Sequence, residues 1–365
     1  MAATAPRGQL DDTQAEAARK IDHLLLAAAR FGASDLHVHV GHPATMRLHG
    51  RLVATRTETY TAEAAEHDLM QILTPRQGEA FLEHGDLGFA YEIPGKLRTR
   101  ATYCRQQRGG MDGVFRLIPL EIPEIKALGL PGELARFTTF HQGLVLFTGP
   151  AGCGKSTTMA GLVNVINGER EEHIITIEDP IEFVYPSMKC LVRQRQVVDH
   201  TAGFETALRA ALREDPDIII VGELRDMASI ALAITAAETG HLVFGTLHTS
   251  SAIRTINRIL DVFPAKQAPQ IRSMVSESLR GIISQRLVLT ADKKRRVPAV
   301  EVLSVNHAVS NLIREGKTFQ IHSLMQVGRT SGMRLLDDAL AEYLSQGVIT
   351  MDEARRHAEK KEQFS

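Results

Sequence analysis

The stretch Gly149-Pro150-Ala151-Gly152-Cys153-Gly154-Lys155-Ser156 decides the fold of this chain. It fits the phosphate-binding loop pattern G-x-x-x-x-G-K-[ST], and Thr157 extends it into an expected helix over 156–167 that Gly168 closes. An apolar run at 144–147 precedes the loop. Glycines let backbone N–H groups wrap a polyphosphate, and the helix start adds the positive end of a dipole. We therefore expect residues 149–157 to bind a nucleotide, with Lys155 on its outer phosphates and the Ser156 hydroxyl on Mg²⁺.

The composition of the 365 residues limits the class of protein. The chain is 44% hydrophobic and has no tryptophan, so aliphatic side chains must fill its cores. A net charge of −1 argues against nucleic acid or an anionic membrane as the main partner. The three scattered cysteines form neither a disulfide framework nor a C-x-x-C pair. Without a signal-peptide core or an apolar run of about 18 residues, we expect a cytoplasmic protein that does not insert into the membrane.

The hydrophobic pattern divides the chain into two domains. We expect a flexible tail over 1–19, with a helix that starts near Asp12 and stops at Gly32, and a small α+β domain over 20–118. Its alternating strands are predicted at 36–40, 87–93, 97–103 and 114–118, with a turn at His49-Gly50 and helices over 61–84 that break at Pro75. Prolines and glycines between 119 and 142 predict a linker.

From residue 143 onwards the pattern changes. Short apolar runs without alternation occur at 144–148, 174–177, 218–221 and 242–247, with helices between them. Buried parallel strands have this pattern, so residues 143–365 are predicted to be a doubly wound α/β domain. Further helices are expected in its C-terminal part, at 265–281, 306–315, 331–346 and 351–362, and a solvated hairpin around the basic run 293–296.

Three of the predicted parallel strands lead directly into polar residues. Glu178 and Asp179 follow the second strand, Glu223 follows the third, and His248 follows the fourth. Ligands of such sheets bind at the carboxyl ends of the strands, where the phosphate loop also lies. We expect Glu223 to polarise an attacking water or to hold Mg²⁺ through a water, with Glu178 or Asp179 sharing either duty. His248 either orients the outer phosphate region or only fixes the strand end.

The thiol of Cys153 permits two interpretations. Near Lys155 and a helix start it could have enhanced thiolate character and react with alkylating agents. An inert small side chain packed under the loop is the favoured alternative.

Several runs of sequence resemble those of one ATPase superfamily. Ile177-Glu178-Asp179-Pro180-Ile181-Glu182, Leu212-Arg213-Glu214-Asp215-Pro216-Asp217 and the run 240–249 resemble the Asp, Walker B and His boxes of the secretion and type IV pilus ATPases. The resemblance extends from about residue 20 to residue 350. Residues 32–37 are similar to the N-terminal signature of that superfamily, and 309–315 resemble the C-terminal motif of its PilT branch, the pilus retraction motors. Val309, Ser310 and Cys153 depart from the usual residues.

Other branches of the superfamily fit the sequence less well. Extension motors and type II secretion motors carry long extra N-terminal domains and commonly a four-cysteine zinc insert, and the traffic ATPases of type IV secretion lack the signature at 312–315. Two alternatives to a retraction motor remain open. One is an accessory paralogue or a nucleotide-binding regulator of another motor, and the other is a DNA-translocating or recombination ATPase with a similar core.

The resemblance implies an architecture and a mechanism. It implies an N-terminal α+β domain of PAS-like fold, followed by a RecA-like ATPase domain with a helical C-terminal part. It also implies a homo-hexamer that binds ATP and Mg²⁺, hydrolyses ATP to ADP and phosphate, and rocks its domains against each other. Arginines of the N-terminal domain would reach the nucleotide, and the matching positions are Arg98, Arg100 and Arg116. The implied partner is the inner-membrane platform protein of a pilus machine, where the hexamer would act peripherally in retraction and twitching motility.

Overall fold

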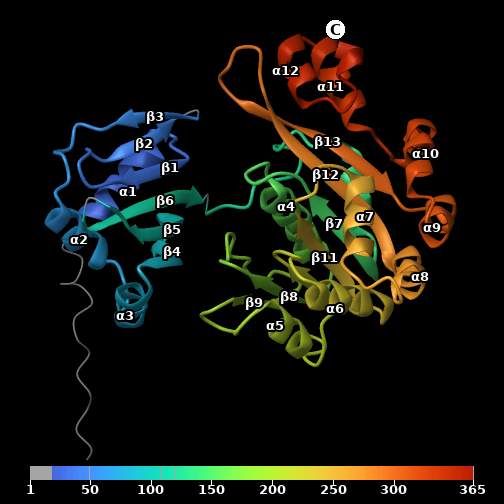
Figure 1. The fold of residues 1–365 in the computed structure, drawn as a ribbon, viewed down its shortest axis with the longest axis horizontal. Coiled ribbons are helices and arrows are strands. Elements are labelled where there is room, and N and C mark those ends of the chain that lie inside the picture. The colour runs from blue at the N-terminus through green and yellow to red at the C-terminus, as the bar shows by residue number, and fades with distance from the viewer. Residues whose placement is uncertain (1–18, 49, 108, 119, 365) are drawn as a thin grey trace, which may run out of the picture. The chain divides into compact units, whose positions relative to one another are not determined.

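The chain forms two compact units, Met1–Leu120 and Glu121–Ser365. The computed structural model describes residues 19–364, except 49, 108 and 119. Figure 1 labels the elements of both units along the chain. The expected tail and the helix start near Asp12 lie outside the described residues, and the first described helix, α1, spans Lys20–Arg30.

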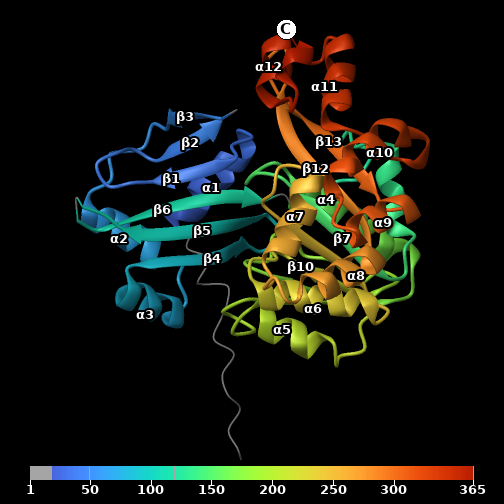
Figure 2. The same ribbon diagram turned by 45° about the vertical axis from the view of Figure 1, so that its right-hand side comes forward.

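The first unit is a six-stranded antiparallel sheet with helices on one face. Its strands are β1 (Asp35–Val38), β2 (Thr45–Leu48), β3 (Arg51–Ala54), β4 (Asp86–Ile93), β5 (Leu97–Arg105) and β6 (Met111–Ile118), in the order β3-β2-β1-β6-β5-β4. Helices α1, α2 (Ala62–Met70) and α3 (Pro75–His84) contribute Leu25, Leu69 and Phe81 to a core with apolar residues of the sheet. Figure 2 shows this sheet from a second direction.

The local chemistry of this unit follows its sequence pattern. Core and exposed residues alternate along β5, as period-two patterning requires. Pro75 is the first residue of α3, where its missing N–H costs nothing, and Thr74 with Gln77 forms a capping box ahead of it. The predicted α+β class and the break at Pro75 are thus confirmed. Of the predicted turn at His49-Gly50, His49 lies outside the described residues.

The second unit is built on a seven-stranded sheet. Its strands are β7 (Gly143–Thr148), β8 (His173–Glu178), β9 (Leu191–Gln196), β10 (Ile218–Val221), β11 (Leu242–Leu247), β12 (Leu279–Leu289) and β13 (Arg296–Ser304), in the order β13-β12-β7-β11-β10-β8-β9. Only β13 pairs antiparallel, forming a hairpin with β12. Every residue of β7 and β11 is buried, which explains the continuous apolar runs and confirms the predicted parallel sheet.

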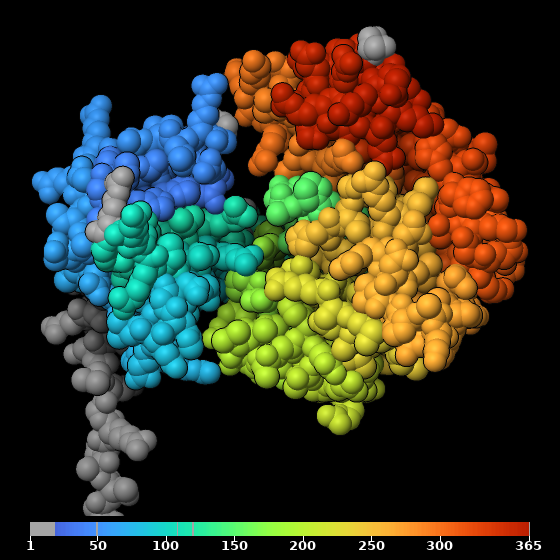
Figure 3. Space-filling view, in the orientation of Figure 1, coloured from blue at the N-terminus to red at the C-terminus, as the bar shows by residue number. Residues whose placement is uncertain are grey.

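Helices and short turns complete the second unit. They are η1 (Gly132–Thr138), α4 (Lys155–Glu169), α5 (Phe204–Ala211), α6 (Met227–Glu238), α7 (Ala252–Asp261), α8 (Ala268–Ser278), α9 (His307–Arg314), η2 (Thr318–Gln320), α10 (Ile321–Val327), η3 (Gly328–Ser331), α11 (Leu336–Ser345), α12 (Met351–His357) and η4 (Lys361–Phe364). The last helices form the red surface in Figure 3. They pack on β12 and β13 through a small core that includes Val288, Leu340 and Ile349.

Several boundaries or elements in this unit differ from the sequence-based expectation; for example, the helix expected from residue 331 begins at Leu336, because Leu335 is extended. Helix α4 continues through Gly168, which keeps a negative φ and so does not end the helix. Strand β12 begins at Leu279, inside a region predicted as helix up to 281, because Leu279 is extended and pairs with β7. Helix α12 ends at His357, since Ala358 is already extended. The edge strand β9 was not predicted, because most of its residues are polar and at least partly exposed.

The proline- and glycine-rich segment before β7 belongs to the second unit from residue 121 onwards. In η1, Leu134 and Phe137 are fully buried. Further upstream, Pro123, Ile125 and Leu128 pack against the middle of α4 at Gly161, where an added Cβ would lie 3.2 Å from Ile125 Cγ1. Much of this segment is therefore held against the core of the second unit.

Candidate functional site

The phosphate loop connects β7 to α4, as the sequence predicts. Gly149, Gly152 and Gly154 have φ values of 138°, 72° and 90°, which residues with a side chain rarely adopt. A Cβ on Gly149 would lie 2.3 Å from the carbonyl oxygen of Gln285. The glycines are thus required by backbone conformation and by close packing. Pro150, Ala151 and Gly152 are exposed at the tip of the loop, where a phosphate can reach them.

Lys155 and Ser156 open α4 directly after the loop. The Lys155 ammonium donates to the carbonyl oxygens of Gly149 and Pro150, at 2.8 and 3.0 Å. These contacts fold the side chain back over the loop. The Ser156 hydroxyl makes no hydrogen bond to any residue that the structure describes, and Ser156 and Thr157 are both partly exposed. A hydroxyl with its lone pairs available in the first helical turn suits one oxygen position of a hydrated Mg²⁺.

Glu223 lies between the side chains of Arg225 and His248 at the carboxyl end of β10. Its carboxylate oxygens are 2.7 Å from Arg225 Nη2 and 3.1 Å from His248 Nε2, and 21% of the side chain is exposed. Burial alone would raise the pKa of Glu223, but the hydrogen bond and charge of Arg225 and the charge of His248 outweigh it and lower that pKa. Glu223 is therefore an ionised, partly accessible hydrogen-bond acceptor at neutral pH.

Backbone contacts fix the position of this carboxylate. The Thr246 hydroxyl of β11 donates to the carbonyl of Gly222, and the Leu224 N–H donates to the carbonyl of Thr246 at 3.0 Å. On the other side, the Gly222 N–H donates to the carbonyl of Ile177 at the end of β8, at 2.8 Å. The segment that carries Glu223 is thus clamped between β8 and β11. The sequence did not reveal this clamp.

The two acidic residues after β8 have different surroundings. Glu178 accepts hydrogen bonds from the Thr176 hydroxyl (2.6 Å) and the Gln194 amide (3.1 Å). Burial raises the pKa of Glu178 to about 6 against the opposing effect of these hydrogen bonds. Asp179 is exposed and lies 3.9 Å from Arg225, so the Arg225 guanidinium faces both Asp179 and Glu223. Arg225 was not predicted from the sequence. It links Asp179 of the Asp box to Glu223, the carboxylate that follows β10.

Cys153 has no enhanced thiolate character. The residue is 3% exposed, and burial raises the pKa of its thiol despite the opposing charge of Lys155. This supports the interpretation as a small side chain packed under the loop.

The three candidate arginines share the outer face of the sheet in the first unit. Arg100 and Arg116 are directly opposite each other on β5 and β6. Arg98 pairs with Glu92 at 2.8 Å, and Arg116 pairs with the buried Asp35 at 3.1 Å. Arg100 is exposed and forms no ion pair or hydrogen bond with the described residues. It is therefore the one of the three whose guanidinium is not engaged within its own unit.

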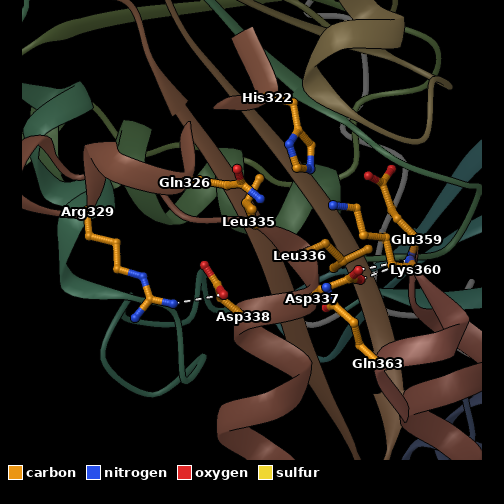
Figure 4. A pocket seen from close by; sticks show the side chains of 10 residues that line it. All are labelled: His322, Gln326, Arg329, Leu335, Leu336, Asp337, Asp338, Glu359, Lys360 and Gln363. Atoms are coloured by element: carbon orange, nitrogen blue, oxygen red, sulfur yellow. Dashed lines mark hydrogen bonds and ion pairs between the residues drawn. The ribbon is translucent and has the colours of Figure 1, made fainter. Parts of the chain in front are cut away.

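A separate cavity of about 200 Å³ lies in the C-terminal part, away from the loop residues (Figure 4). It is lined by His322, Gln326, Arg329, Leu335, Leu336, Asp337, Asp338, Glu359, Lys360 and Gln363. Asp337 accepts the backbone N–H groups of Glu359 and Lys360, at 2.8 and 2.9 Å, and Asp338 pairs with Arg329. Asp337 thus holds the chain after α12 against α11, and Asp338 connects α11 to η3, which explains both carboxylates as structural residues.

Comparisons with known proteins identify the family. Residues 124–360 match the model of the type II/IV secretion system protein family. The chain is 46% identical over 347 residues to the type IV pilus retractation ATPase PilT of Pseudomonas aeruginosa, covering 94% of this chain and 99% of that protein. It is 44% identical over 320 residues to a twitching motility protein of Neisseria gonorrhoeae, covering 88% of this chain and 85% of that protein.

A solved structure of similar fold supports the same family. The pilus retraction motor PilT with bound ADP superposes with a TM-score of 0.85 at 41% identity, covering 93% of this chain and 97% of that chain. This confirms the predicted architecture of an N-terminal domain followed by an ATPase domain. No helix in the described part of this chain combines the length and the apolar character needed to cross a membrane. The chain belongs to the type II/IV secretion system protein family, within the group of PilT ATPases.

Proposed function

We propose that this chain is the subunit of a homo-hexameric ATPase motor that retracts a type IV pilus. The observation that carries the proposal is the ionised Glu223 at the carboxyl end of β10, on the sheet edge that also carries the phosphate loop. Membership in the PilT group supports the retraction role. PilT itself is known with bound ADP, which supports a nucleotide at the loop of this chain.

Lys155 and Ser156 would bind the phosphate end of ATP. The Lys155 ammonium would leave the carbonyl oxygens of Gly149 and Pro150 and bind phosphate oxygens instead. A hydrogen bond from an ammonium group to a charged phosphate oxygen is stronger than one to a neutral carbonyl oxygen. The Ser156 hydroxyl would hold Mg²⁺. When bound, that ion supplies charge neutralisation on the transferred phosphoryl group.

Glu223 would orient the attacking water and accept its proton. A carboxylate with a lowered pKa is a weak base, so its main contribution is to position and polarise the water rather than to remove the proton early. Arg225 and His248 hold the two carboxylate oxygens and thereby fix the direction of the remaining lone pairs. His248 would act as a positioning residue through Glu223. Asp179 would contribute through Arg225, which it faces, and Glu178 would share the duty of orienting the water or holding Mg²⁺.

An arginine from the N-terminal unit would complete the site. We favour Arg100, because Arg98 and Arg116 are already paired within their own sheet. A guanidinium at the outer phosphate neutralises the charge that develops during phosphoryl transfer. Its arrival and departure with each ATP would couple hydrolysis to movement of the two units. Sequential movement around a hexamer would act on the inner-membrane platform protein of the pilus machine, and the motor would then work peripherally on the cytoplasmic side.

The proposal predicts a separation of binding from hydrolysis in the Glu223→Gln variant. The amide keeps the size of the side chain but cannot accept a proton, so ATP should bind with nearly unchanged affinity. Turnover should fall by at least about 100-fold. The measurements are phosphate release and equilibrium binding of a fluorescent ATP analogue. Glu205→Gln, a change in an exposed ion pair of α5, serves as the matched control and should retain full turnover.

Two results would contradict the motor function. Wild-type hexamers that bind ATP without any turnover would point to a nucleotide-binding regulator. Turnover that requires single-stranded or duplex DNA, with binding that weakens steeply with salt, would point to a translocase. Normal turnover together with normal twitching after deletion of the gene would identify an accessory paralogue.

A further inference from the structure

Gln285 of β12 contacts the phosphate loop at several points. Its side-chain Nε2 donates to the Cys153 carbonyl at 2.7 Å, and its Oε1 accepts from the Thr158 hydroxyl of α4 at 2.7 Å. Its own backbone carbonyl borders Gly149, and its Nε2 would lie 2.7 Å from a Cβ on Gly154. Gln285 is 4% exposed, so these contacts exclude water. The side chain of Gln285 thus connects the end of the loop with the first turns of the helix, and the backbone carbonyl of the same residue borders the start of the loop.

The register of the sheet places Gln285 at this point. Strand β12 runs parallel to β7, and Ser284 pairs with Thr148, the last residue before the loop. Gln285 therefore lies level with Gly149, where β7 turns away into the loop. The sequence separation between Gln285 and Cys153 is 132 residues, so no local pattern could reveal the contact.

The amide of Gln285 has only one orientation that satisfies both partners. The Cys153 carbonyl can only accept, so it requires the NH₂ group, and the Thr158 hydroxyl then donates to Oε1. A flipped amide would place two acceptors against each other in a buried site, which costs free energy. The Cys153 carbonyl therefore sets the direction of the Gln285 amide, and Thr158, itself 2% exposed, holds its Oε1 with the second hydrogen bond.

The bond to the Cys153 carbonyl determines where the next N–H points. Carbonyl and N–H of one trans peptide point in opposite directions. By holding the Cys153 carbonyl against β12, Gln285 turns the Gly154 N–H away from β12. Backbone N–H groups that point into the loop are what bind phosphate oxygens in such loops. Without this bond the peptide between Cys153 and Gly154 would be less restrained, because Gly154, on its C-terminal side, tolerates a wide range of φ.

We propose that Gln285 is a positioning residue that preorganises the phosphate loop by fixing the peptide between Cys153 and Gly154, with Thr158 fixing Gln285 in turn. The inference rests on the proposed nucleotide site and adds to it the residue that shapes the loop. The loop N–H groups contact phosphate both before and during hydrolysis. Loss of Gln285 therefore weakens binding of substrate and transition state alike, which raises KM and leaves kcat nearly unchanged.

The test compares Gln285→Met with wild type in the full-length protein. Met fills a similar volume but makes neither hydrogen bond. The Kd for Mg-ADP and the KM for ATP should both rise about ten-fold, with kcat within about two-fold of wild type. Asn167→Leu is the matched control. It removes a buried amide at the other end of α4, which bonds Pro186 and Met188, and it should lower the melting temperature while leaving the Kd for ADP unchanged.

A second variant separates positioning from packing. In Gln285→Glu the ionised carboxylate repels the Cys153 carbonyl, whereas the protonated acid can donate to it from its O–H. The Kd for ADP, relative to wild type at the same pH, should therefore be raised at pH 8 and approach wild type toward pH 5.5. A purely structural defect would show no such recovery. If Gln285→Met does not fold, Thr158→Val decides, with an expected rise of about three-fold in the Kd for ADP.

The failure of this inference can be told apart from failure of the proposed function. Wild-type Kd and KM in Gln285→Met or Thr158→Val, or a loss confined to kcat, would overturn the positioning role while hydrolysis by wild type still stands. Conversely, wild-type hexamers without turnover would overturn the motor function, yet a weakened Kd for ADP in Gln285→Met would still support the positioning role.

Discussion

At the residue scale, Glu223 is held between Arg225 and His248, which come from the segments after β10 and β11. The predicted parallel arrangement of the strands placed Glu223, Glu178 and His248 at one edge of the sheet. Arg225 could not be predicted, because its role depends on facing Asp179 and Glu223 at once. An arginine two residues after a candidate base has many possible directions. Only the packed loop selects one of them.

Removal of Arg225 should change the pH dependence of hydrolysis. In Arg225→Gln, burial becomes the main influence on the carboxyl group of Glu223, so the pKa of this group should rise. The acidic limb of kcat/KM should then move to higher pH, since an adjacent guanidinium favours the ionised form of a carboxyl group and lowers its pKa. The measurement is ATP hydrolysis between pH 5 and pH 9. Arg209→Gln on the exposed face of α5 is the control, and an unchanged acidic limb in Arg225→Gln would exclude this electrostatic role.

At the element scale, the elements around the site differ in how far the sequence reveals them. The four buried parallel strands were predicted because both of their faces are apolar. Strand β9 was missed, since an edge strand with three exposed or half-exposed polar residues has no clear period. The start of α7 also depends on a distant contact. Its first N–H, from Ala252, donates to the buried carboxyl of Glu301 on β13, at 2.6 Å.

The capping of α7 by Glu301 should make stability depend on pH. Burial raises the pKa of Glu301 to about 7, above its ordinary value of 4.5, so the fold favours the protonated acid. The stability from this group is full below about pH 4.5 and is lost as the pH rises through about 7. Glu301→Gln stays neutral and can still accept from Ala252. Its unfolding free energy relative to wild type should therefore increase by up to about 3 kcal/mol between pH 4.5 and pH 8.5.

Chemical denaturation at several pH values tests this expectation. Glu342→Gln, which changes a half-exposed partner of Arg334, serves as the control and should show little pH-dependent difference. A difference between Glu301→Gln and wild type that stays constant with pH would mean that Glu301 has an ordinary pKa in the folded protein.

At the scale of the whole molecule, each unit has its own core, and the candidate site residues divide between the units. The loop and the acidic residues belong to the second unit, and the three arginines belong to the first. The sequence could assign residues to units, because the change from alternating to continuous apolar runs is visible in it. The sequence could not rank the three arginines, because the ranking depends on two ion pairs, Arg98 with Glu92 and Arg116 with Asp35.

Individual alanine variants should rank the arginines by their effect on hydrolysis. Arg100→Ala should reduce kcat the most, on the order of 1000-fold, because its guanidinium is not engaged within its own sheet. Arg98→Ala and Arg116→Ala should have smaller effects on kcat. Arg105→Ala is the matched control, because this side chain lies on the same strand but over the Phe81 ring. Equal kcat values for Arg100→Ala and Arg105→Ala would rule out a finger role for Arg100.

The packing of Pro123, Ile125 and Leu128 at Gly161 sets a limit on the motor. With that segment held on α4, the covalent tether between the units runs only from Ile118, the end of β6, to Pro123. The five Cα–Cα steps from Ile118 to Pro123 span at most about 18 Å when the chain is fully extended. The distance by which the two units of one subunit can move apart is therefore limited by this short tether, not by the full length of the proline-rich segment. In the proposed motor, long pilus excursions would then come from many small steps.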